Sequence, residues 1–243
     1  ISFDLYAKRS AAKTPKVRIE TCVFCHYQIS SKMLDAGHPD LNFEITYFQK
    51  TMPVHWVETP DKGDGFSAKI AAAGQAASLR EALKKLASSS GKKNVGASYD
   101  QVMSHYKILK AIASAGFGST GGLDAGMKGL AGSNAGASKL VGAADKLFNT
   151  LIGASYSKAS TPKIMKAISG SADLTGGPTK KDAEQTFMIL DGIYSTYGSD
   201  EGILAALDEL YYGLYAEDPA QEAPPYDAKA FGQNLAKVKS VVK

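Results

Sequence analysis

The sequence has no long apolar run, few cysteines and little excess charge. No apolar segment approaches the roughly 18 residues that a bilayer-spanning helix needs, so we expect no transmembrane segment. Hydrophobic residues make up 44% of the 243 and charged residues 21%, which excludes global disorder and a collagen-like chain. The formal net charge is only +4, and no basic stripe is interleaved with aromatic residues, so nucleic acid is not an expected partner. These absences leave a soluble globular protein.

The first residues are basic. Lys8, Arg9, Lys13 and Lys16 stand against one acid, Asp4. The same bias is typical of the end of a targeting peptide and of a solvated arm that docks on a partner. We interpret residues 1–15 as a solvated arm that docks on a partner. The sequence leaves the location of the protein open; one of the open locations is an organelle, where the protein would be soluble or peripheral.

Residues 16–90 are predicted to form a small α/β unit. Alternation of Val17, Ile19 and Thr21 with polar residues indicates a half-buried strand that ends at the first cysteine. A short helix is expected next, then two paired strands, a turn and a longer helix. Their predicted bounds are 26–36 for the first helix, 41–48 and 53–58 for the strands, 59–65 for the turn, and from Ser67 for the second helix, whose Leu79, Leu83 and Leu86 share one face.

Residues 95–243 are predicted to be all helical. A break at 89–94 marks the expected boundary between the two units, and Ser98 with Gln101 has the pattern of a capping box that opens the next helix. Ten of the 24 glycines fall in 116–153, interleaved with alanine and serine. Further helices are predicted to begin at Thr161–Pro162, at Thr179 with Asp182, at Ser199 and at Asp227.

The sequence Cys22-Val23-Phe24-Cys25 is the most specific signal in the chain. It lies where the predicted strand turns into a helix, and the dipole at a helix N-terminus stabilises a thiolate. The two-residue spacer lets the second sulfur resolve a mixed disulfide. Cys22 is therefore the candidate catalytic nucleophile and Cys25 the candidate resolving thiol.

Residues 16–66 resemble the selenoprotein W-like group of thioredoxin-fold proteins. The resemblance is carried by a strand, the C-x-x-C turn, a helix, a hairpin and Lys62-Gly63-Asp64-Gly65-Phe66 before the next helix. It implies a cysteine-based redox module linked to glutathione or thioredoxin. The fold class that follows is α+β, with a small thioredoxin-like module at 16–90 and an all-helical bundle at 95–243.

Other uses of the same cysteines stay open. C-x-x-C followed by His26 is the c-type haem attachment pattern, with Met33 or Met52 as a distal ligand. Zinc is a second alternative, and a structural disulfide or a pair of inert thiols is a third. We predict no cofactor and no metal site; His105 is interpreted as a structural histidine. The zinc ligands would be Cys22, Cys25, His38 and His55.

Two functions follow from these patterns. In the first, the cysteines perform thiol–disulfide exchange and the helical part docks a partner protein. In the second, the chain is a non-enzymatic accessory or structural subunit of a larger organellar complex, photosynthetic or respiratory, and its C-x-x-C is structural or vestigial. Both imply a protein partner, and the sequence does not decide whether the chain is an enzyme.

Overall fold

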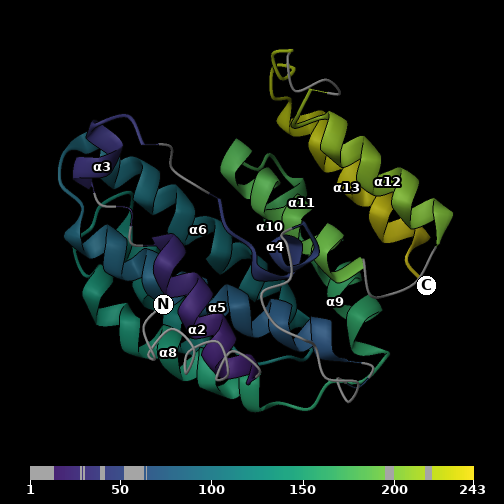
Figure 1. The fold of residues 1–243 in the computed structure, drawn as a ribbon, viewed down its shortest axis with the longest axis horizontal. Coiled ribbons are helices and arrows are strands. Elements are labelled where there is room, and N and C mark those ends of the chain that lie inside the picture. The colour runs from purple at the N-terminus through teal and green to yellow at the C-terminus, as the bar shows by residue number, and fades with distance from the viewer. Residues whose placement is uncertain are drawn as a thin grey trace, which may run out of the picture.

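The computed structural model describes residues 14–27, 29, 31–38, 42–51, 63, 65–194, 200–216 and 221–243, and every regular element in this part of the chain is a helix (Figure 1). The helices follow one another without an intervening strand in these ranges. They are α2 (Pro15–Tyr27), α3 (Ser31–Asp35), α4 (Ile45–Thr51), α5 (Phe66–Ser88), α6 (Lys92–Ser114), α7 (Gly121–Leu130), α8 (Ala137–Gly153), α9 (Ser160–Ser169), α10 (Ala172–Thr175), α11 (Lys180–Tyr194), α12 (Glu201–Tyr212) and α13 (Ala228–Val241).

The predicted α+β class and its thioredoxin-like module are wrong. The segment predicted as the first strand is helix α2, which begins with proline at its first position and buries Ile19, Val23 and Tyr27. These residues are four apart, so the segment also has a helical apolar face, which extends further than the short alternation used to predict a strand.

The second strand prediction fails in the same way. Residues 41–48 alternate in hydropathy, yet α4 begins at Ile45. Glu44 accepts a hydrogen bond from the backbone N–H of Tyr47 at 2.7 Å, which satisfies one of the unpaired donors at the start of this helix. The partner strand predicted at 53–58 lies outside the described residues.

Several helix boundaries differ from their predictions. The helix expected at 26–36 is divided between the end of α2 and the short α3. Ser98 and Gln101 are buried inside α6, which begins six residues earlier at Lys92, so they form no capping box. Ser98 instead shares a hydrogen bond with Ser89 at 2.9 Å across the connection between α5 and α6.

Other helix starts are confirmed. The backbone N–H of Thr179 donates to Asp182 and that of Asp182 donates back to the Thr179 hydroxyl, at 2.9 and 3.1 Å, the reciprocal arrangement of a capping box. The Asp227 carboxylate caps α13 by accepting from the N–H groups of Lys229 and Ala230.

Helix α5 lies at the centre of the packing, with α2, α6 and α8 beside it (Figure 1). Most of its residues are buried, and alanine dominates them, so neighbouring backbones can approach closely. The α12–α13 pair lies on the opposite side of the molecule from α2 and α8 (Figure 1). The buried alanine and glycine residues of α5 are Ala68, Ala71, Ala72, Ala73, Gly74, Ala76, Ala77 and Ala82.

Helix α4 fits between α5 and α11 because each of these helices has a glycine where α4 approaches it. A Cβ atom at Gly74 of α5 would lie 2.6 Å from Cγ2 of Ile45, and one at Gly192 of α11 would lie 2.6 Å from the backbone nitrogen of Tyr47. Backbone atoms cannot move away as a flexible side-chain end can. The absence of a side chain at Gly192 is therefore a condition for the observed position of α4.

Replacing Gly192 with alanine should destabilise the protein because the new methyl group overlaps the α4 backbone. We expect a loss of about 1–3 kcal/mol in the free energy of unfolding, measured by urea denaturation. Gly142→Ala in α8 is the matched control, since nothing lies within 4 Å of a Cβ atom there, and it should stabilise the helix by up to about 1 kcal/mol. Equal effects of the two substitutions would contradict this packing.

Candidate functional site

The two cysteines do not lie where a thioredoxin-type redox pair would. Both are inside α2, with Cys22 about two turns from its start, and both thiols are free. The helix dipole acts within the first turn, so it does not activate Cys22. Burial raises the pKa of the Cys22 thiol, and the nearby Arg18 guanidinium offsets only part of this effect. Cys25 is exposed.

The other predicted ligands are dispersed. The His26 ring stacks on Phe43 with centroids 4.0 Å apart, and burial lowers its pKa. Met33 and His38 are exposed after α2, and Met52 and His55 lie outside the described residues. In the described ranges, no three histidine, cysteine or acidic side chains come together as metal ligands would.

A groove of about 460 Å³ opens where the C-terminal ends of α2 and α5 meet. We name it the α2–α5 groove. Phe24, Tyr27 and Ile29 form its apolar part, and Phe24 has 51% of its surface exposed. The remaining lining residues are Lys32, Glu81, Lys84, Lys85, Ser88, Ser89 and Ser90.

The groove is positively charged. Glu81 is the one acid among the described residues that line it; it is buried and accepts from Lys84 Nζ at 2.9 Å and Arg80 Nε at 2.8 Å. Lys32 and Lys85 add further positive charge at the rim. An apolar floor with a basic rim suits a ligand that is both apolar and acidic.

Tyr27 also begins a buried polar chain that runs into the interior, formed by Tyr27, His105, Gln75, Glu44 and Thr46. The Tyr27 hydroxyl is hydrogen bonded to His105 Nε2, and His105 Nδ1 donates to Gln75 Oε1 at 2.7 Å. Burial lowers the pKa of His105 to about 3, so its ring is neutral at neutral pH. The prediction of a structural histidine agrees with this fully bonded, fully buried ring.

Glu44 is at the inner end of the buried polar chain. Burial raises the pKa of its carboxyl group from 4.5 to about 7, although hydrogen bonds from Thr46 and Tyr47 lower it. Gln75 is near enough to lower this pKa as well, yet neither Gln75 Nε2 nor Glu44 Oε1 completes a hydrogen bond with the described part of the chain. The sequence analysis missed Glu44; its one signal was a single acid within an apolar run.

No family model, curated protein or solved structure matches this chain. The resemblance to the selenoprotein W-like group therefore rests on its sequence motifs alone, and the fold that it implied is wrong. No helix of the described residues is both long and apolar enough to cross a bilayer.

The two thiols should differ in reactivity. We expect iodoacetamide to alkylate Cys25 faster than Cys22 at neutral pH, because Cys25 is exposed and burial keeps Cys22 protonated. Mass spectrometry of the modified peptides, with Cys22→Ser and Cys25→Ser chains as references, measures both rates. Faster reaction at Cys22 would show that it is activated after all.

Replacing Glu44 with glutamine should change how stability depends on pH. The folded-state pKa of about 7 exceeds the unfolded-state value of 4.5, so the stability that Glu44 contributes is fully present below pH 4.5 and is lost as the pH rises through 7. At about 1.4 kcal/mol per pKa unit, the loss is about 3 kcal/mol.

Urea unfolding between about pH 4.5 and pH 8 tests this expectation. The parent chain should lose about 3 kcal/mol relative to Glu44→Gln across the range; Glu222→Gln, which removes an exposed carboxylate, is the control. His105 has the opposite effect, because its lowered pKa removes stability as the pH falls from 6.5 through 3, but it is present in all three chains. A constant difference for Glu44→Gln would contradict its buried, neutral state.

Proposed function

We propose that this chain is a non-enzymatic accessory subunit that docks onto a protein partner through the α2–α5 groove. The observation that carries the proposal is the exposed Phe24 ring beside this basic groove. Aromatic residues are enriched in protein interfaces, and an apolar side chain left in water at the edge of a groove favours a binding surface.

The partner that fits is a segment with an apolar anchor flanked by acidic residues. Phe24, Tyr27 and Ile29 would contact the anchor, and Lys32 and Lys85 would lie near the acidic groups. Met33, 42% exposed in the neighbouring α3, extends the apolar surface. Charge complementarity of this kind sets orientation and association rate more than affinity.

The state of the thiols favours the accessory role over thiol–disulfide exchange. Cys22 is within a helix and its pKa is raised, so neither the helix dipole nor a lowered pKa prepares it for nucleophilic attack. Exchange at Cys22 and Cys25 stays a prediction from the sequence.

A native-gel experiment on the full chain in extracts of its source cells tests the docking proposal. The parent chain should migrate in an assembly much larger than its own 25.6 kDa. Phe24→Ala should shift most of it to the free position, because losing an aromatic anchor from an interface costs about 2 kcal/mol or more. Leu204→Ala, which removes a 45% exposed apolar side chain from α12, is the matched control and should leave the assembly intact.

The exposed Cys25 thiol, next to Phe24, supplies a second readout. In the assembly it should be protected from alkylation, and after purification of the chain it should react. A parent chain that migrates at its own mass, or a Phe24→Ala chain that stays in the large assembly with Cys25 protected, would overturn the proposal.

A further inference from the structure

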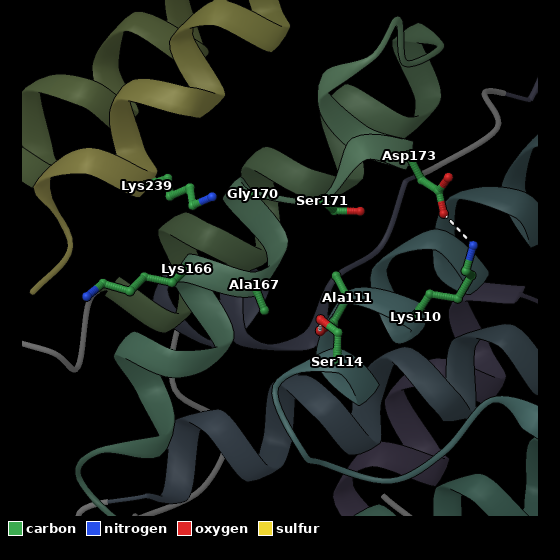
Figure 2. Close-up of a pocket in the computed structure, with 9 residues that line it drawn as sticks. All are labelled: Lys110, Ala111, Ser114, Lys166, Ala167, Gly170, Ser171, Asp173 and Lys239. Carbon is green, nitrogen blue, oxygen red and sulfur yellow. Dashed lines mark hydrogen bonds and ion pairs between the residues drawn. The ribbon is translucent and has the colours of Figure 1, made fainter.

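A second pocket lies on the other side of the molecule, between α6, α9, α10 and α13. Figure 2 shows its residues, and its volume is about 370 Å³. We name it the Lys239 pocket. Its lining residues are Lys110, Ala111, Ser114, Lys166, Ala167, Gly170, Ser171, Asp173 and Lys239.

Three lysines from three helices surround this pocket, and Asp173 is the one acid among its lining residues. Lys110 Nζ is 2.6 Å from a carboxylate oxygen of Asp173, so that acid is already paired. Lys166 and Lys239 have no acidic partner in the part of the chain that the structure describes. The lining residues therefore carry a net charge of about +2, which favours an anion with two negative charges.

Gly170 allows the Lys239 ammonium group to lie at the pocket wall. A Cβ atom at residue 170 would be 2.8 Å from Lys239 Nζ and 2.9 Å from its Cε. Figure 2 shows the Lys239 side chain directed towards Gly170, and the Lys166 side chain extending away from the other labelled residues. An alanine at 170 would crowd this ammonium group, which is the end of a flexible side chain and can shift aside.

The remaining lining side chains are small. Ser171 is at the N-cap position of α10, and its side chain makes no capping hydrogen bond in the described part of the chain. The side chains of Ala111 and Ala167 add apolar surface, so the pocket wall is about as apolar as it is polar. The volume of the pocket suits a compact charged group better than a long peptide segment.

We propose that the Lys239 pocket binds a phosphate group, either of a small phosphorylated molecule or of a lipid headgroup. Lys239 and Lys166 supply the two unpaired positive charges, and the Ser171 hydroxyl donates a hydrogen bond to a phosphate oxygen. Lysine binds phosphate as a point charge on a flexible stem, so Lys166 can turn inwards when the anion arrives. This pocket is separate from the α2–α5 groove and does not depend on the proposed docking function.

Isothermal titration calorimetry with inorganic pyrophosphate, on the full chain, tests the proposal. The Lys166→Gln/Lys239→Gln double variant should bind pyrophosphate about tenfold more weakly than the parent, or more weakly still. Lys229→Gln removes an exposed charge from the same helix α13 outside the pocket, and it should bind as the parent does.

Vesicles distinguish the two sources of phosphate. If the ligand is a lipid headgroup, the parent should cosediment with phosphatidylcholine vesicles that contain phosphatidic acid but not with vesicles of phosphatidylcholine alone, and the double variant should cosediment with neither. If the parent binds pyrophosphate but cosediments with neither kind of vesicle, the ligand is a small phosphorylated molecule. Equal weakening in Lys229→Gln would mean an adventitious ion only. Absence of pyrophosphate binding by the parent, or a double variant that loses thermal stability but keeps its affinity, would overturn the proposal.

Discussion

The structure depends on one packing constraint: neighbouring helices must approach closely to the small-residue surface of α5. Alanine and glycine occupy most of its buried positions, so α2, α4, α6, α8 and α11 can all contact it. A larger side chain at these positions would have to displace an entire helix, because protein interiors leave little empty volume to absorb it.

The same constraint creates the polar features of the interior. Close approach brings Gln75 of α5 within hydrogen-bond distance of His105 of α6, and puts it near Glu44 before α4. Polar side chains in such a dry environment bond to one another, and one oxygen of Glu44 has no hydrogen-bond partner among the residues that the structure describes. The buried polar chain ends at Tyr27, so the groove proposed to dock a partner is connected with the core of the protein.

The helical half of the chain could be predicted because its signals are local. Asp227 caps α13 through its own side chain, and Thr179 with Asp182 forms a capping box within four residues. Nothing beyond these short segments is needed for such a prediction. Ser98 and Gln101 have the same pattern but are buried inside α6, which begins at Lys92, and Ser98 is hydrogen bonded to Ser89 instead of capping a helix.

The helix predicted from Ser67 is confirmed as α5, but the segments before it could not be predicted because they satisfy two periodicities. Ile19, Val23 and Tyr27 lie four apart while Val17, Ile19 and Thr21 alternate, and only the presence of α5 decides between helix and strand. The candidate site depends on contacts as distant as His105 with Tyr27, which no local pattern reveals. The cysteine motif was the strongest sequence signal, and its meaning changed once α2 proved to be a helix.

Native-state hydrogen exchange of the α5 amides tests the central claim most directly. If α5 is the element on which the others pack, the amides of residues 70–83 should exchange only through global unfolding, and their opening free energies should be the highest in the chain. Amides of the peripheral α13 should exchange through smaller, local openings. If the α5 amides exchanged faster than those of α13, the close packing around α5 would not be what holds this fold together.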